Sequence, residues 1–186
     1  MKVKRIVSLL LVAVMLCSVL ALTGCGKVHS TVKVVFINDV QKQLDIEEQK
    51  ELSKKTDGTQ TTKALTDDDY IIGQATVTVE GTEQNPPTVL KAAEAALIYL
   101  EFENGYELTN DGYSVKAVNG IVEVDETDAT TGYYSYWKAT VDGQESTSGR
   151  QSETVVYDGQ TVEFRFVSDS RPREDVKSNA TTEDVD

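Results

Sequence analysis

The sequence predicts an α+β fold resembling a β-grasp, in which one helix packs on an antiparallel or mixed sheet. Segments 74–80 and 160–167 alternate apolar and polar residues, as strands with one buried face do. Segment 89–100 carries apolar residues at helical spacing. The β-rich segments of the second half are separated by pairs typical of tight turns, at Asn119-Gly120, Asp142-Gly143 and Asp158-Gly159.

The first strand is predicted over Thr31 to Asn38, which is dense in β-branched and aromatic residues. A polar and charged insertion follows, from about 39 to 69. Its few apolar positions form only a thin stripe, so we expect a short helix over about 40–55 and then a flexible linker. The fold tolerates such an insertion because the entropic cost of closing a loop grows slowly with its length.

The second strand is predicted over 74–80, and Pro86-Pro87 follows it because proline has no N–H to give to a strand ladder. Thr88 is the expected N-cap of a helix from Val89 to about Leu100. This is the clearest helix in the sequence. Asn104-Gly105 is predicted to provide the left-handed stop after it.

The rest of the domain is predicted to be β. We expect a hairpin from 113–118 and 121–124, a long strand over 133–141, and closing segments at 155–157 and 160–167. In the last of these, alternation puts Val162, Phe164 and Phe166 on one face and Thr161, Glu163 and Arg165 on the other.

The N-terminus has the pattern of a bacterial lipoprotein signal. Basic residues precede an apolar stretch over 6–22, and Leu22-Thr23-Gly24-Cys25 resembles the lipobox, in which the cysteine receives a lipid and the signal is cut before it. The less favoured interpretation is that this segment is a transmembrane anchor and that its cysteine is incidental. We therefore expect a signal peptide at 1–24, a tether at 25–30, the domain at 31–168 and a disordered acidic tail at 169–186. The expected location is the extracytoplasmic face of the cell membrane, with Cys25 as the lipid attachment site.

Charge and cysteine content narrow the possible partners. Removing the three basic residues of the signal takes the formal net charge from −13 to −16. Such an acidic surface repels phosphate backbones, so nucleic acid is not an expected partner, and membrane attachment would depend on the lipid. Cys17 would leave with the signal, which rules out a disulfide framework in the mature chain.

The sequence offers no recognisable catalytic set, and we expect the protein not to be an enzyme. Its only histidine, His29, lies near Cys25 and is expected to be a solvated linker residue. Neither GxGxxG nor GxxxxGK[ST] occurs. Acidic runs at 67–69 and 125–128 lack the spacing of a known calcium loop and are expected to be solvated, so no metal site is predicted.

The most suggestive local feature is the aromatic cluster in strand 133–141. Alternation puts Tyr134 and Tyr136 on one face and Tyr133 and Trp137 on the other. We expect Trp137 to pack under the helix. Tyr134 and Tyr136 are then the better candidates for a platform that stacks on a sugar or flat cofactor. The alternative, which is favoured about two to one, is that these tyrosines only stabilise the sheet.

Several short segments resemble the transcobalamin-like C-terminal domain, also known as domain of unknown function 4430, which occurs in lipoproteins of Gram-positive bacteria. The resemblance spans about 31–167, and Asp142 stands where the family usually has Asn. It implies the β-grasp-like fold. In the vitamin B12 carriers of this family, the domain closes over cobalamin held mainly by a helical barrel, which this chain lacks. The segments that carry the resemblance are 75–80, 88–93, 115–121, 136–143 and 157–160.

Three functions follow as hypotheses. The first is a surface-anchored, non-enzymatic binding or adhesion module for a small molecule, a glycan or a surface protein. The second is a lipoprotein that captures a corrinoid or another flat nutrient with the help of a partner chain; no cofactor is expected, with cobalamin as a possible ligand. The third is a structural component of an envelope assembly that pairs through free sheet edges.

Overall fold

The computed structural model describes residues 26–55, 64–124, 134–145 and 149–169. Cys25, Tyr133, the predicted signal peptide and most of the predicted tail lie outside these residues. The elements, in chain order, are β1 (Lys27–Asn38), α2 (Asp39–Lys55), η1 (Asp67–Tyr70), β2 (Ile71–Thr82), α3 (Val89–Leu100), β3 (Tyr106–Leu108), β4 (Val115–Val118), β5 (Ile121–Val122), β6 (Tyr134–Val141), β7 (Gln144–Glu145) and β8 (Thr161–Asp169).

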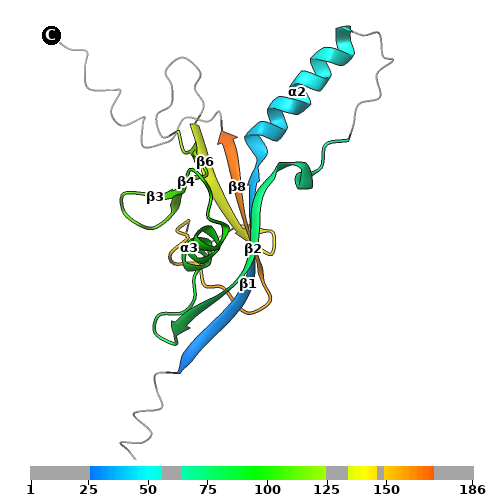
Figure 1. Ribbon diagram of the computed structural model, residues 1–186. Coiled ribbons are helices and arrows are strands. Elements are labelled where there is room, and N and C mark those ends of the chain that lie inside the picture. Colours follow the sequence, from blue (N-terminus) through cyan, green and yellow to red (C-terminus); the bar gives the residue numbers. More distant parts are fainter. Residues whose placement is uncertain (1–25, 56–63, 125–133, 146–148, 170–186) are drawn as a thin grey trace, which may run out of the picture.

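These elements form a mixed α+β architecture, as the sequence predicts. A five-stranded sheet has the order β2-β1-β8-β6-β7, and a three-stranded sheet has the order β3-β4-β5. β1 and β8 are parallel, and the other neighbours in both sheets are antiparallel. Helix α3 covers one face of the larger sheet, and α2 projects away from it (Figure 1). Among the described residues, no helix is long and apolar enough to cross a bilayer.

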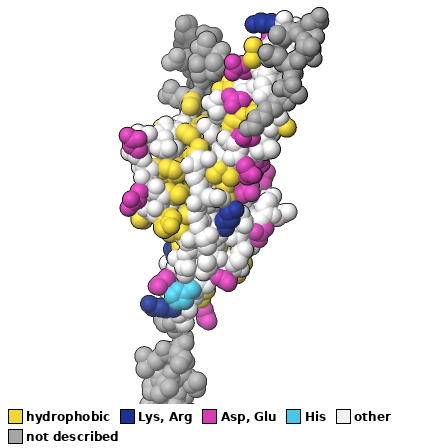
Figure 2. Space-filling model, turned by 45° about the vertical axis from the view of Figure 1, so that its right-hand side comes forward, with side chains coloured by type: hydrophobic (Ala, Val, Ile, Leu, Met, Phe, Trp, Pro, Cys, Tyr) yellow, Lys and Arg dark blue, Asp and Glu magenta, His cyan; other side chains and the backbone are white. Residues whose placement is uncertain are grey.

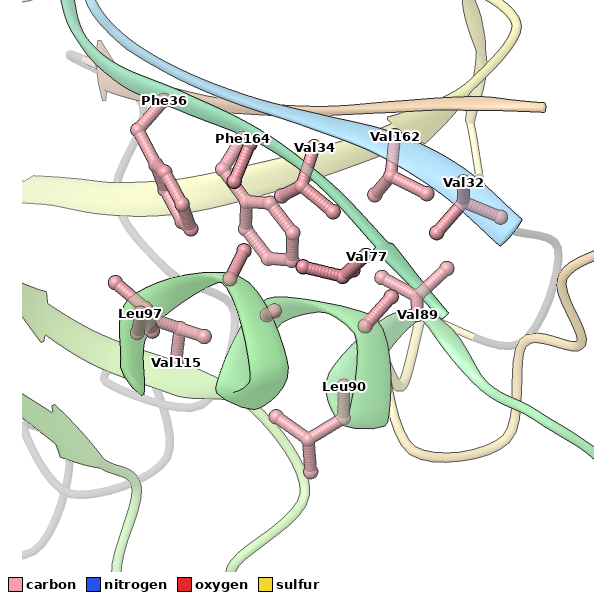
Figure 3. Close-up of a cluster of buried hydrophobic side chains, with 14 of the residues drawn as sticks. Val32, Val34, Phe36, Val77, Val89, Leu90, Leu97, Val115, Val162 and Phe164 are labelled. Carbon is pink, nitrogen blue, oxygen red and sulfur yellow. The ribbon is translucent and has the colours of Figure 1, made fainter. Parts of the chain in front are cut away.

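The core lies between α3 and the larger sheet (Figure 3). Phe36 of β1 stacks on Phe164 of β8 with ring centroids 5.2 Å apart, and Trp137 of β6 meets Phe36 edge-on at 6.3 Å. Alternation along β8 buries Phe164 and Phe166, as predicted. Because each fully buried large apolar side chain contributes about 1.5–3 kcal/mol, this layer is the main source of stability.

Helix α3 begins where the sequence predicts, and Thr88 Oγ1 accepts a hydrogen bond from the Lys91 N–H at 3.4 Å. The helix also ends at Leu100, as predicted, but its left-handed cap is Glu101, with φ 46°, and not Asn104-Gly105. This early turn brings Phe102 back over β2. A Cβ on Gly73 would approach Phe102 Cζ to 2.5 Å, so only glycine leaves room for that ring.

All three predicted turns of the second half form, and two of them join paired strands. Asn119 and Gly120 have φ of 48° and 79°, and Asp142 and Gly143 have φ of 49° and 76°, as two-residue hairpin turns require. Segment 155–157 is not a strand; Val155 makes only an isolated bridge with Thr88. The Asp158-Gly159 turn is closed by the Gln160 N–H, which donates to the carbonyl of Tyr157 at 3.3 Å, but it joins no hairpin. Its Gly159 N–H donates instead to the carbonyl of Thr31 in β1 at 2.8 Å.

The predicted insertion contains the expected helix, α2, which has no buried side chain. The linker predicted after it, to about 69, lies outside the described residues over 56–63. Its last part is wrong, because 67–70 forms η1, and Asp67 of the acidic run that the sequence predicts to be solvated is ion-paired with Lys42 and Arg165. The predicted tether is partly wrong: β1 starts at Lys27, before the predicted Thr31, and continues the pairing with β2 to Thr82. His29 is therefore a strand residue, with Nδ1 3.7 Å from Glu80 Oε1 on β2 and the side chain about half exposed.

Candidate functional site

A cavity of about 320 Å³ opens beside β6, between the two sheets. It contains Tyr136 and Trp137 of the predicted aromatic cluster. Polar side chains from four separate segments complete the wall. The lining residues are Thr109, Ser114, Glu123, Tyr136, Trp137, Lys138, Ala139, Glu145, Gly149 and Gln151.

The outer edge of β6 holds this wall in place. Val124 and Ser135 exchange two backbone hydrogen bonds of 3.0 and 3.3 Å, which tie the three-stranded sheet to β6. One step further along, the Trp137 N–H donates to Glu123 Oε1 at 3.2 Å. The Trp137 indole Nε1–H donates to the carbonyl of Ile121 at 3.1 Å. Glu123 and Trp137 are thus fixed relative to each other on one side of the cavity.

Gln151 fixes the other side. It is 6% exposed, its Nε2 donates to the carbonyl of Trp137 at 3.2 Å, and its Oε1 accepts from the Val115 N–H at 2.8 Å. A buried amide satisfied at both ends has little freedom to rotate. The sequence gives no sign of this role, because Gln151 lies in a polar segment far from both partners.

The open side of the cavity is charged. Lys138 and Glu145 form an ion pair between β6 and β7. Both side chains are partly exposed, so a ligand could displace the pair at small cost. Figure 2 shows more acidic than basic side chains on one face of the molecule, in keeping with the net charge of −13.

The predicted aromatic cluster is only partly assembled as a platform. Trp137 is buried, at 2% exposure, but it meets the rings of Phe36 and Phe166 and donates its indole N–H to Ile121 of the three-stranded sheet, so its packing under the helix stays a prediction. Tyr134 and Tyr136 share a face, but they stack on each other with centroids 5.5 Å apart and planes 18° apart. Each ring therefore covers one face of the other. Tyr136 reaches the cavity wall and Tyr134 does not line it. Whether either tyrosine contacts a ligand stays a prediction.

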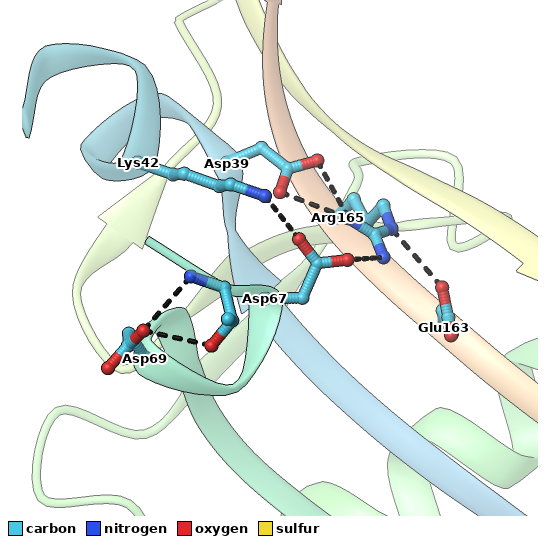
Figure 4. Close-up of polar contacts among 7 residues, drawn as sticks. Asp39, Lys42, Asp67, Asp69, Glu163 and Arg165 are labelled. Carbon is cyan, nitrogen blue, oxygen red and sulfur yellow. Dashed lines mark hydrogen bonds and ion pairs between the residues drawn. The ribbon is translucent and has the colours of Figure 1, made fainter. Parts of the chain in front are cut away.

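A second polar cluster lies on the face of the larger sheet that α3 does not cover, where Arg165 of β8 pairs in register with Lys138 of β6 (Figure 4). The Arg165 guanidinium donates two hydrogen bonds to Asp39, of 3.1 and 3.2 Å, and one of 2.8 Å to Asp67. Lys42 also pairs with Asp67, and Arg165 pairs with Glu163 at 3.2 Å. The cluster thus ties α2 and η1 to β8.

The charges of this cluster shift the pKa values of its members. Hydrogen bonds from Lys42 and then Arg165 lower the pKa of Asp67 below 3.8. Burial lowers the pKa of Arg165, but the bonds to Asp67 and Asp39 outweigh it and leave the pKa above its usual range. Outside the cluster, burial and then the hydrogen bond that its hydroxyl donates to Asp45 raise the pKa of Tyr70 to about 12.

We interpret this second cluster as structural. A cavity of about 310 Å³ lies beside it, lined by Asp39, Lys42, Gln43, Ile46, Arg165 and Val167. Because Arg165 and Lys42 are already paired with carboxylates, they are poorly placed to recruit an anion. The sequence correctly puts Arg165 on the wet face of its strand but gives no indication of its partners. The cavity beside β6 is the better candidate site.

Comparisons with known proteins add little to this picture. No family model matches the chain, and no curated protein matches it. One structural neighbour is haptocorrin, a transcobalamin-like protein, in "Crystal Structure of Haptocorrin in Complex with Cbi", with a TM-score of 0.42 and 12% identity. The match covers 75% of this chain and 25% of that chain, so this protein spans only a quarter of its neighbour. The similarity is weak.

Proposed function

We propose that the protein is a non-enzymatic binding module that holds a small, ring-bearing polar ligand in the cavity beside β6. The observation that supports this best is the composition of the wall. Tyr136 lines the cavity together with Glu123 and Gln151, whose side chains are held in place by hydrogen bonds to the backbone of Trp137. Ligand sites commonly combine aromatic surface with a few well-placed polar groups.

The size and charge of the cavity favour a neutral glycan unit. Its volume of about 320 Å³ lies at the small end of the usual range for ligand pockets, about 300–1,000 Å³, and suits one or two rings. A sugar ring presents C–H groups to an aromatic side chain and hydroxyls to carboxylates and amides. An anionic ligand would meet a strongly acidic surface.

The single tryptophan offers a direct test, because Trp137 lines the cavity. The full chain, kept in detergent, is titrated with neutral oligosaccharides while indole fluorescence is recorded. We expect a saturable change with at least one glycan. Tyr136→Ala should weaken it about tenfold or more, since an aromatic anchor often contributes 2 kcal/mol or above. Tyr157→Ala, which removes an exposed tyrosine outside the cavity, is the matched control.

Two outcomes contradict the proposal. One is that no glycan in the panel changes the fluorescence. The other is that Tyr136→Ala binds as well as the wild type. A corrinoid is included as a separate arm, read from its visible spectrum, because capture of a flat nutrient is the alternative function. Saturable corrinoid binding without glycan binding would favour that alternative.

We also propose that Cys25 anchors the module to the outer face of the cell membrane. The lipobox-like segment Leu22–Cys25 supports this. Cells fed a labelled fatty acid should incorporate the label into the wild-type protein. Cys25→Ser should abolish incorporation. Cys17→Ser is the control and should leave incorporation unchanged, because Cys17 lies in the signal that is removed. An unlabelled wild type would contradict the anchor and leave the binding site untouched.

A further inference from the structure

The larger sheet ends at β2, whose far side pairs with no strand in the part of the chain that the structure describes. β2 has 12 residues. Unpaired strand edges attract other strands, and proteins usually protect them with short length, charge, proline or bulges. The middle of β2, residues 74–79, has neither a charge nor a proline, and its register with β1 is unbroken there. This edge is open to another strand.

The hydrogen bonds of β1 show which groups of β2 face that edge. The Lys33 N–H donates to the carbonyl of Gln160, on the β8 side of β1. Backbone groups alternate sides along a strand, so those of Val32 point to β2, where Val77 is its partner in register. It follows that the residues between these partners direct their N–H and C=O groups to the free edge; they are Gln74, Thr76, Thr78 and Glu80.

Helix α3 presents an apolar flank on the same side. Leu97 lies beside Val115 of β4 (Figure 3), and β4 in turn contacts β6. At 3.6 residues per turn, Ala95 and Tyr99 lie on the flank of α3 that faces away from β4. Because β6 and β2 lie toward opposite ends of the larger sheet, that flank faces outward on the side of the free β2 edge. Tyr99 is 72% exposed, and the adjacent Ile98 is 65% exposed.

We propose that the β2 edge and the Tyr99 flank of α3 bind a second copy of this chain. The two β2 strands pair antiparallel about a twofold axis that passes through Val77, which is the middle of the alternating segment 74–80. The two sheets become one continuous sheet of ten strands, five from each copy, and the two α3 helices lie side by side on one face.

The edge is self-complementary in this register. Thr76 lies opposite Thr78 of the second copy, and both direct backbone groups to the edge, so they form a hydrogen-bonded pair. Gln74 lies opposite Glu80 of the second copy. Glu80 is the only charge on β2, and Lys27 of its own chain lies 3.7 Å from it. No like charges face each other across the axis.

A second copy fits this surface better than a foreign strand does. An isolated strand would satisfy the backbone groups of β2 but leave Tyr99 in water. A twofold axis perpendicular to the sheet brings the same surface of both copies together, so the edge and the helix flank are covered at once. The interface is isologous and closes as a dimer, which leaves no free β2 edge for further assembly.

The test measures the protein mass of the full chain in detergent by light scattering during size-exclusion chromatography. We expect twice the chain mass of 20.4 kDa for the wild type. Thr76→Pro removes an edge N–H without removing a bond to β1, and Tyr99→Glu puts a charge on the helix flank. Each should weaken dimerisation about tenfold or more. Thr76→Ser and Tyr157→Glu are the matched controls and should remain dimeric.

A monomeric wild type at the highest soluble concentration would overturn the proposal. So would a dimer that persists in both Thr76→Pro and Tyr99→Glu, because it must then use another surface. Trp137 emission checks folding, since the indole is buried. If Thr76→Pro does not fold, Thr76→Lys, which places two charges near the axis, takes its place with the same expected loss of the dimer.

Discussion

The carbonyl oxygen of Trp137 accepts a hydrogen bond from Nε2 of Gln151 at 3.2 Å, and both side chains are buried. The other end of the same amide accepts the Val115 N–H at 2.8 Å. Gln151 therefore joins β6 of the five-stranded sheet to β4 of the three-stranded sheet, and the candidate cavity lies along this junction. The geometry of the site depends on it.

Replacing Gln151 with alanine should destabilise the protein. The change leaves the Val115 N–H and the Trp137 carbonyl without their side-chain partner in a buried setting, and an unsatisfied buried polar group costs about 1–3 kcal/mol. Urea unfolding followed by Trp137 fluorescence gives the free energy of unfolding. Gln144→Ala, in exposed β7, is the control and should change it by less than about 0.5 kcal/mol. Equal values for the two variants would show that Gln151 does not support the junction.

Lowering the pH should remove stability contributed by Asp67. The bonds from Lys42 and Arg165 hold its folded pKa below 3.8, so the carboxylate stabilises the fold above its unfolded pKa, and this contribution is lost as the pH falls through the folded pKa. Urea unfolding of the wild type and Asp67→Asn is compared from about pH 6 down to about pH 3. The gap between them should narrow with acid. A gap that stays constant would argue against this ionisation.

Removing Arg165 should loosen the insertion and spare the sheet. Arg165 is the common partner of Asp39 in α2 and Asp67 in η1, while α2 itself buries no side chain. In Arg165→Met, hydrogen exchange of the α2 and η1 amides should therefore accelerate. The α3 amides should keep their protection. Arg165→Lys, which retains the charge but not the planar fork, should fall in between. Unchanged exchange in α2 would mean that the cluster does not hold the insertion.

Glycine at position 101 should stabilise the protein. Glu101 is left-handed, with φ 46°, a conformation that costs a residue with a Cβ about 1 kcal/mol relative to glycine. Glu101→Gly should accordingly raise the free energy of unfolding by about 0.5–1 kcal/mol. Glu103→Gly, at an exposed position without positive φ, should not raise it. A loss of stability in Glu101→Gly would show that the residue makes a contact worth more than its strain.

Sequence patterns predict elements whose signals are local. Helix α3 is predicted from Val89 to Leu100 because a capping threonine and an apolar stripe agree with each other. β3 and β7 are missed because three and two residues are too few to show alternation. The end of α3 at Leu100 is also as predicted, but the left-handed residue after it is Glu101 and not Asn104-Gly105, because Phe102 must return over Gly73, which is a tertiary effect.

The site is less predictable than the fold for the same reason. Trp137 and Tyr136 stand out in the sequence, but Gln151 is an unremarkable polar residue whose partner Val115 lies 36 positions away. Arg165 is separated from Asp39 by 126 positions and from Asp67 by 98. Such contacts carry no periodic signal. Only the folded structure shows that Gln151 lines the cavity beside β6 and that Arg165 and Asp39 line the second cavity.

The most direct test of the binding proposal is a residue-by-residue NMR titration with the best oligosaccharide of the panel. We expect saturable shifts at the Trp137 indole N–H, at the backbone amides of Tyr136 and Lys138, and at the Gln151 side-chain amide, with little change along α2. Shifts that instead cluster on α2 and Arg165, or no saturable shift with any ligand, would contradict a site beside β6.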